Sequence, residues 1–354
     1  MASVDKLPSG RWRTRWVDPN GKPQSQSFPF KRDADRLKKQ VEHDLMTDTY
    51  IDKAAGDQTF EVFAQGWQAV QVYRPGTAVQ VEGNLRRHVY PALGARALRS
   101  IKRSDIQGLV KSLPLAPATV EVIYRYTSTI FSAAVADKLI AASPCVKIKL
   151  PEIIKVEVVP MAVQTVEAIR EAMPPHLQAL ITFAAGTGLR QGECFGLTVD
   201  RIDFDKANTK VDRQAVQTNG GPPDLDAPLK TTASYRTVPL APVVVEALRG
   251  HLSQFPPGPE RLVFTDAKRQ PLQRSRFGEV WHRSVDPLAL AARPTFHDLR
   301  HFYASLLIHR GLSVKVVQAR LGHKTAKETM DTYAHLWPDS EDESREAVQD
   351  VLGL

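Results

Sequence analysis

The chain has 354 residues, of which 42% are hydrophobic and 24% are charged, a composition typical of a globular protein with two or three domains. Lysine and arginine outnumber aspartate and glutamate by 47 to 39, and the net charge of +8 favours a polyanionic partner, either nucleic acid or an anionic membrane surface. The longest apolar stretches are too short for a membrane span, the first residues lack the apolar core expected of a signal peptide, and the two cysteines are too few for a disulfide framework. These features exclude the membrane-spanning and secreted classes and predict a reducing, cytoplasmic location.

The basic surplus is spread over most of the chain. Residues 1–56 carry a net charge of +3, and residues 57–160 and 161–338 carry +5 each. Residues 339–354 are the exception, with a net charge of −5. Three basic segments favour a polyanion that contacts most of the chain, whereas the acidic end suits a protein neighbour.

Residues 1–56 predict a small β-sheet followed by a helix. Side chains alternate with a period of two from residue 11 to residue 16, so one face of this strand carries Trp12, Thr14 and Trp16. The other face carries three arginines, Arg11, Arg13 and Arg15. Exposed arginines are often only a solvated face, but on a basic segment of this size they favour contact with DNA.

Residues 57–150 predict a bundle of four helices, because apolar residues recur at helical spacing. Pro75 is placed to begin the second helix and Pro91 to end it, and Ser104 with Gln107 forms a capping box for the third. Single basic residues on such a bundle are more often solubilising groups than ligands. The candidates for DNA contact are Arg86, Arg87 and Lys111.

Residues 151–160 predict an extended linker, and residues 161–338 form the largest segment. Two helices begin this segment, strands are predicted over 200–204, 210–216 and 236–240, and the rest is mainly helical. The expected fold class is therefore multidomain α+β. It combines a small sheet with a helix (1–56), a helical bundle (57–150), and a mainly helical domain with a small antiparallel sheet (161–338), before the tail (339–354).

Polar residues that a hydrophobic core does not explain occur in the largest segment. Arg190 and Glu193 stand three apart at the start of a helix, where Glu193 can orient the guanidinium and the amide groups attract an anion. A structural ion pair explains this motif equally well. Lys230 precedes a predicted strand, and a lysine at a hairpin tip is usually exposed and inert, although a mobile tip can bring its ammonium group to a partner.

A second group of polar residues lies near the end of this segment. His297 and Arg300 stand three apart at the margin of an apolar helix stripe, His323 follows the end of another helix, and Tyr333 comes ten residues later. A lone tyrosine at helical spacing is more often a core residue than a nucleophile. Together, two arginines, a lysine, two histidines and a tyrosine in a basic domain suit phosphoryl transfer on a nucleic-acid backbone.

In these motifs the sequence resembles the tyrosine recombinase (phage integrase) family. The matching residues, in the family's order and spacing, are 187–193, Lys230 with Thr231, Ser234 and Arg236, 297–301, 321–323 and Tyr333. The resemblance implies that 161–338 is the tyrosine recombinase catalytic domain. It further implies that 1–56 is an arm-site DNA-binding domain, that 57–150 is a SAM-like core-binding domain, and that 339–354 exchanges between subunits.

The resemblance also implies how the DNA backbone is cut. Tyr333 would attack the scissile phosphate and form a 3′-phosphotyrosyl link, and Arg190 and Arg300 would clamp that phosphate. Such a link retains the energy of the broken phosphodiester, so strand exchange needs no ATP. The sequence also lacks metal-ligand and P-loop motifs, and neither a metal nor another cofactor is predicted.

The remaining motif residues have supporting roles in this scheme. Lys230 would protonate the leaving 5′ oxygen, and His297 would assist proton transfer on the nucleophile side. His323 would hydrogen-bond the phosphate, and Glu193 would support the site. No motif residue departs from the family's pattern.

The leading hypothesis is a DNA integrase of a bacteriophage or similar mobile element, acting at the nucleoid in the cytoplasm of a bacterial host. The resemblance implies a homotetramer on duplex attachment sites with core and arm sites, an accessory DNA-bending protein and an excisionase.

One alternative is a type IB-like topoisomerase or resolvase with the same chemistry. Another is a non-catalytic DNA-binding regulator, which would require a lost catalytic residue. The acidic tail either docks on a neighbouring subunit through Val348, Val351, Leu352 and Leu354 or is disordered.

Overall fold

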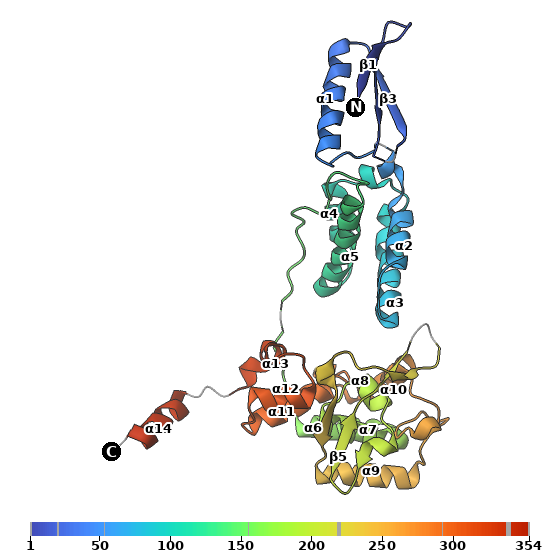
Figure 1. Ribbon diagram of the computed structural model, residues 1–354. Coiled ribbons are helices and arrows are strands. Elements are labelled where there is room, and N and C mark those ends of the chain that lie inside the picture. Colours follow the sequence, from blue (N-terminus) through green and yellow to red (C-terminus); the bar gives the residue numbers. More distant parts are fainter. Residues whose placement is uncertain are drawn as a thin grey trace. The chain divides into compact units, whose positions relative to one another are not determined.

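The computed structural model describes residues 2–19, 21–52, 54–154, 156–217, 221–291, 293–337 and 341–352. The chain divides into two units, residues 1–154 and residues 155–354, which are described separately (Figure 1). The division falls within the predicted linker 151–160, whose described residues form neither helix nor strand. Among the described helices, none combines the length and the apolar character needed to cross a membrane.

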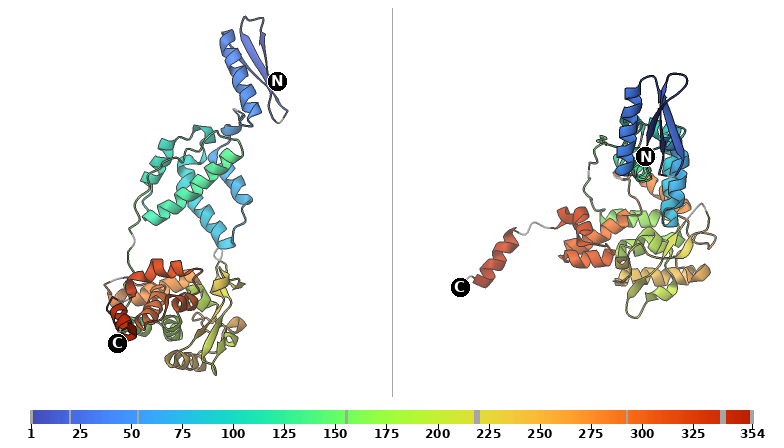
Figure 2. Two further views of the ribbon diagram at one scale, coloured as in Figure 1. Left: turned by 60° about the vertical axis from the view of Figure 1, so that its left-hand side comes forward. Right: turned by 45° about the horizontal axis from the view of Figure 1, so that its top comes forward.

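The N-terminal unit begins with a three-stranded antiparallel sheet. In spatial order its strands are β1 (Ser3–Lys6), β2 (Trp12–Val17) and β3 (Pro23–Phe28). Helix α1 (Lys31–Met46) lies beside this sheet (Figure 2). The alternation predicted for β2 is confirmed: Thr14 and Trp16 are buried, and the Thr14 hydroxyl donates to the carbonyl of Ala34 at 2.8 Å. Strand β1 was not predicted, because four residues are too few to establish a period.

The rest of this unit is a helical bundle, as predicted. Its helices are α2 (Phe60–Ala69), α3 (Pro75–Asn84), the π-helix η2 (Leu85–Gly94), α4 (Arg103–Ser112) and α5 (Pro117–Ala136). Pro91 lies inside η2 instead of ending a helix, because the wider π-turn accommodates its ring. Asp105, not Ser104, caps α4: its carboxylate accepts from the backbone N–H of Lys102 at 2.7 Å, and a negative charge there also complements the helix dipole.

The C-terminal unit is mainly helical, with two small antiparallel sheets. Its helices are α6 (Val163–Ala172), α7 (Pro175–Thr187), α8 (Gln191–Phe195), α9 (Pro242–Gln254), α10 (Arg274–Val285), α11 (Asp298–His309), α12 (Val314–Leu321), α13 (Ala326–Tyr333) and α14 (Glu341–Leu352). Its strands are β4 (Ile202–Asp203), β5 (Asn208–Val211), β6 (Gln214–Val216), β7 (Asp224–Ala227) and β8 (Arg236–Pro239), ordered β4-β5-β8 and β6-β7. The strand predicted over 210–216 is two strands in different sheets, and β7 was not predicted.

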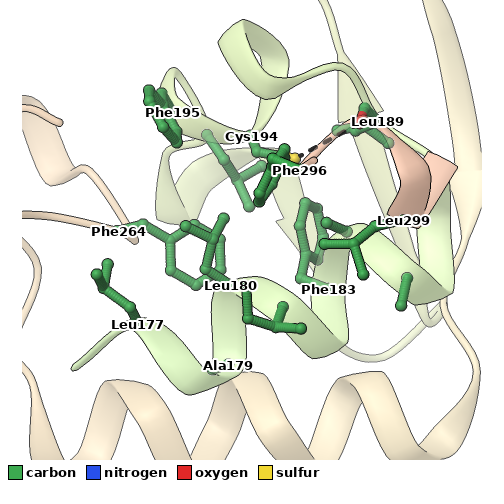
Figure 3. Close-up of a cluster of buried hydrophobic side chains, with 14 of the residues drawn as sticks. Leu177, Ala179, Leu180, Phe183, Leu189, Cys194, Phe195, Phe264, Phe296 and Leu299 are labelled. Carbon is green, nitrogen blue, oxygen red and sulfur yellow. Dashed lines mark hydrogen bonds between the residues drawn. The ribbon is translucent and has the colours of Figure 1, made fainter. Parts of the chain in front are cut away.

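Aromatic side chains pack in the core to which α7 and α8 contribute (Figure 3). The rings of Phe183 and Phe264 lie 5.7 Å apart, and those of Phe195 and Phe296 lie 6.3 Å apart. Burying one such side chain stabilises the fold by roughly 1.5–3 kcal/mol. Cys194, also fully buried, donates through Sγ to the carbonyl of Leu189 at 3.9 Å. This packing holds the short turn between α7 and α8, and Arg190, the first residue of the candidate site along the chain, lies on this turn.

Candidate active site

Two helices of the C-terminal unit end at glycines in the left-handed conformation. Gly188 (φ +64°) ends α7, and Gly322 (φ +66°) ends α12. A Cβ at Gly188 would lie 2.4 Å from Cδ1 of Tyr303, and one at Gly322 would lie 2.9 Å from Nη1 of Arg236. Backbone conformation and close packing therefore both require glycine. These two turns present the backbone carbonyls that hold the arginines of the site.

Arg300 bridges the ends of α7 and α12. Its Nη1 donates to the carbonyl of Gly188 and its Nη2 to that of Leu321, both at 2.7 Å. The side chain is 2% exposed, and burial, reinforced by the charge of Arg190, lowers its pKa to about 9. The expectation that Arg300 lies at the margin of its helix stripe is wrong. The reason is that carbonyls at helix C-termini carry partial negative charge and can satisfy a buried guanidinium.

Glu193 is a buried anion between two arginines. As the spacing predicted, Arg190 contacts it, from the backbone N–H to Oε2 (2.8 Å) and from Nη1 to Oε1 (3.0 Å). Arg236, the first residue of β8, donates to both carboxylate oxygens at 3.2 and 2.9 Å. Burial raises the pKa of Glu193, but the hydrogen bonds and charges of the two arginines outweigh it and hold the pKa below its ordinary value. Arg190 also donates through Nη2 to the carbonyl of Gly322 at 3.1 Å, which places it beside the turn that Arg300 contacts.

Tyr333, the last residue of α13, belongs to the same site. Its side chain is 1% exposed, and its hydroxyl lies 2.8 Å from Nδ1 of His301. Burial raises the pKa of Tyr333 to about 12, and the positive charge of Arg300 partly counteracts the shift. The phenol is therefore protonated at neutral pH and lies within electrostatic reach of the buried arginine.

His323, which follows the end of α12, lies near the tyrosine ring. Its ring is nearly parallel to that of Tyr333, with centroids 6.5 Å apart, and its Nδ1 lies 2.9 Å from Oγ1 of Thr329. Burial, with the charge of Arg300, lowers the pKa of His323 to about 4. The histidine is therefore neutral, with one ring nitrogen committed to the threonine.

His297 and Lys230 lie at more exposed positions. His297 is the N-cap of α11, and its ring meets that of His301 edge-on with centroids 4.9 Å apart. Partial desolvation of its ring by the surrounding protein, together with the charges of His301 and Arg300, lowers the pKa of His297 to about 4. Lys230 is exposed in the connection between β7 and the 3-10 helix η5 (Thr232–Ser234). It is not at the tip of the β6–β7 hairpin, because the chain has already passed through β7 when it reaches the lysine.

Three contributors to the site had no predicted role: Arg236, His301 and Thr329. Arg236 and His301 stand inside the recognised motifs, and the four-residue spacing of His301 from His297 was a signal that both share a helix face. Thr329 carried no signal, because its partner His323 comes from a separate turn. Spacing along the chain reveals neighbours on one helix but not partners that packing brings together.

The arginines predicted on β2 are partly neutralised. Asp5 on β1 pairs with Arg13 at 2.9 Å and with Arg15 at 3.2 Å. These partners lower the pKa of Asp5. Arg11 donates through Nη2 to the carbonyl of Ser27 at 3.2 Å. Arg13 and Arg15 therefore lie on β2 as predicted, beside a carboxylate that sequence reasoning missed, whereas Arg11 precedes the strand.

The basic residues predicted on the bundle are exposed. Arg86 pairs with Glu82 at 2.8 Å, and Arg87 donates through Nε to the carbonyl of Gly83 at 2.9 Å. Lys111 lies in the last turn of α4. Their exposure is compatible with both a solubilising and a DNA-binding role.

The comparison with protein-family models finds a match to the phage integrase family over residues 154–339. The chain belongs to this family. It is thus a member of the tyrosine-type site-specific recombinases, and the family and fold class predicted from the motifs are confirmed.

Curated relatives match over most of the chain. The integrase of Mycobacterium phage L5 is 26% identical over 347 residues, which cover 93% of this chain and 92% of that protein. A XerC-like tyrosine recombinase of Caldanaerobacter subterraneus is 28% identical over 309 residues, which cover 79% of each.

Solved structures share the fold. The Tn1549 transposon integrase, solved in complex with a circular intermediate DNA, has a TM-score of 0.70 and 20% identity, and the match covers 83% of this chain and 99% of that one. A lambda integrase dimer bound to a COC′ core site has a TM-score of 0.64 and 18% identity, with coverage of 95% and 96%.

Proposed function

We propose that the chain is the integrase of a bacteriophage or similar mobile element, which cuts and rejoins duplex DNA at attachment sites to integrate the element and to excise it. The observation that carries this proposal is the gathering of Arg190, Arg300 and Tyr333 around the ends of α7 and α12. Family membership and the similarity to the integrase of Mycobacterium phage L5 over 93% of the chain support it.

In this proposal the two arginines clamp the scissile phosphate. Each guanidinium is already held by backbone carbonyls, so little side-chain entropy is lost when it binds a phosphate oxygen. Arg300 is buried away from water. In this low-dielectric environment its attraction to the negative charge that develops on the phosphate oxygens in the transition state is stronger. Tyr333 attacks phosphorus and forms a 3′-phosphotyrosyl link, which releases the 5′ oxygen.

Three other residues assist the reaction. Lys230 protonates the leaving 5′ oxygen, and its exposed position in a connecting loop suits contact with bound DNA. His323, whose Nδ1 faces Thr329, presents Nε2 to the phosphate. His297 assists proton transfer on the nucleophile side. The phosphotyrosyl link conserves the energy of the phosphodiester, so the scheme requires neither ATP nor another cofactor.

The N-terminal unit recognises the DNA site. Residues 1–56 contact arm sites through Arg11, Arg13 and Arg15, and the bundle 57–150 contacts the core site through residues that include Arg86, Arg87 and Lys111. The spread of positive charge over both parts supports this arrangement. A DNA-bending protein and an excisionase would set the direction of the reaction in the host cytoplasm.

We also propose a homotetramer in which α14 of one subunit docks on the next. Val348, Val351 and Leu352 on this helix are exposed, with 81% exposure at Val351, while Leu354 of the predicted stripe lies outside the described residues. The same unit carries a groove of about 600 Å³ lined mainly by apolar side chains of α6, α7, α9 and α11. Two arginines, Arg170 and Arg310, and one acidic residue, Glu167, also line it, and this basic surplus complements the acidic tail.

Deleting residues 340–354 tests this docking. The deletion, and separately Leu306→Asp in the groove, should reduce recombination between two sites while leaving the binding of one subunit to one site unchanged. Equal loss of binding and recombination would count against docking.

Adduct formation tests the proposed reaction. The attachment site is first mapped by footprinting the full chain on the DNA that flanks its own gene, and a nicked duplex of that site serves as substrate. Tyr333→Phe should abolish the covalent protein–DNA adduct and leave binding intact. Tyr303→Phe is the matched control, because this second buried tyrosine packs in the same apolar cluster. An adduct formed by Tyr333→Phe would refute the assignment of the nucleophile.

A further inference from the structure

The hydroxyl of Tyr333 faces a histidine to which the proposed function gives no task. His301 on α11 places Nδ1 2.8 Å from Oη of Tyr333, and the two rings meet at 65° with centroids 5.6 Å apart. Tyr333 belongs to a buried apolar cluster with Tyr303, Ile308 and Leu321, so packing restricts its ring and with it the position of Oη. A hydrogen bond of this length is within the range required for direct proton transfer.

The protonation states suit a bond donated by the tyrosine. Burial lowers the pKa of His301, the charge of Arg300 acts in the same direction, and the charge of Asp298 opposes it. The ring is therefore neutral at pH 7, whereas the phenol with its raised pKa keeps its proton. In the neutral tautomer that carries its proton on Nε2, His301 accepts the hydrogen bond of the Tyr333 hydroxyl at Nδ1. The other titratable neighbours of this pair are His297, whose ring meets His301 edge-on, and His323, whose ring is nearly parallel to that of Tyr333.

We propose that His301 is the catalytic residue that accepts the proton of Tyr333 during cleavage and returns it during rejoining. As the Oη–P bond forms and the P–O5′ bond breaks, the hydroxyl proton moves to Nδ1 of His301, and the departing 5′ oxygen takes a proton from Lys230. In the reverse direction the 5′ hydroxyl returns its proton to Lys230 as it attacks phosphorus, the Oη–P bond breaks, and the imidazolium of His301 reprotonates the departing tyrosine. This inference rests on the proposed role of Tyr333 as the nucleophile.

The alternative histidines are less well placed for this step. His297 contacts His301 through its ring and sits at the exposed helix N-terminus, where it can relay charge between His301 and solvent. His323 commits Nδ1 to Thr329, and its ring lies nearly parallel to the phenol ring with centroids 6.5 Å apart, which is a stacked arrangement and not a hydrogen bond to Oη. His301 is therefore the histidine in hydrogen-bond contact with the reacting oxygen.

Two substitutions separate proton transfer from positioning. His301→Asn keeps an acceptor oxygen near the place of Nδ1 but cannot hold the proton, and His301→Ala removes both functions. Each variant is assayed for single-turnover adduct formation on the nicked, footprinted duplex, alongside DNA binding by titration. Both should lose about 10²- to 10⁴-fold in rate with unchanged binding. Added imidazole should partly restore His301→Ala, and more basic methylimidazoles should restore it further.

His335→Ala is the matched control. This histidine lies two residues after Tyr333, but its Nε2 contacts the carbonyl of Val158, so the cleavage rate should stay within about twofold of the wild type. Wild-type cleavage by His301→Asn would overturn the inference, because the contact would then only position the tyrosine. Failure of every imidazole to restore a folded His301→Ala would also overturn it. An adduct formed by Tyr333→Phe would instead refute the proposed function itself.

Discussion

Replacing Glu193 by glutamine tests whether one buried carboxylate holds the two-arginine site together. Glu193 is 3% exposed and accepts hydrogen bonds from Arg190 and Arg236 through both of its oxygens. Glutamine has nearly the same size, but it carries no charge, and its amide NH₂ would face guanidinium donors. The buried Arg236 would then lack its counter-charge.

The expected loss of stability is large. Removing one partner of a buried ion pair costs about 3–5 kcal/mol, because the remaining charge is left desolvated. For a unit of this size, 1 kcal/mol lowers the melting temperature by roughly 2–4 °C. We therefore expect Glu193→Gln to lower the melting temperature of the C-terminal unit by about 6–20 °C at pH 7.

The loss should also depend on pH in a defined direction. The folded-state pKa of Glu193 lies below the ordinary value of 4.5, so its stabilising contribution is fully present above pH 4.5. The contribution disappears as the pH falls through the folded-state pKa. The difference between wild type and Glu193→Gln should accordingly shrink below pH 4.5.

Differential scanning calorimetry of the full chain between pH 3 and pH 8 measures both effects. Glu171→Gln is the matched control, because this exposed carboxylate pairs with Arg170 at 3.0 Å and should contribute less than about 1 kcal/mol. A Glu193→Gln protein within about 1 kcal/mol of the wild type at pH 7 would refute the reasoning. So would a difference that is independent of pH.

Three further predictions concern other parts of the molecule. Gly188→Ala should destabilise the protein more than Gly311→Ala, since both have positive φ but only a Cβ at Gly188 meets Tyr303; equal melting temperatures would contradict this. Cys194 should react with iodoacetamide only after unfolding, because burial raises its thiol pKa and excludes the reagent, and mass spectrometry of the native protein should find it unmodified. Asp5→Asn should tighten non-specific DNA binding at low salt, since it frees two arginines, whereas unchanged affinity would argue against DNA contact by that sheet face.

Local periodicity accounts for much of the agreement between sequence and structure. The alternation around Thr14 and the helical stripes of the bundle are local consequences of side-chain geometry, so they could be predicted without knowing the fold. The position of Pro91 inside a helix and the strand β7 could not be predicted in this way. A π-turn around a proline and a strand of four residues both depend on neighbours that pack against them.

The sequence by itself determined the residue types and order of the candidate site, and with them the family. Arg190 and Glu193 interact at their predicted spacing because one helical turn makes them neighbours. Only the tertiary structure decided that Arg300 is buried between two helix ends, that Arg236 shares the carboxylate of Glu193, and that His301 meets Tyr333. These contacts join residues 21 to 112 positions apart, and packing creates such contacts without leaving a period in the sequence.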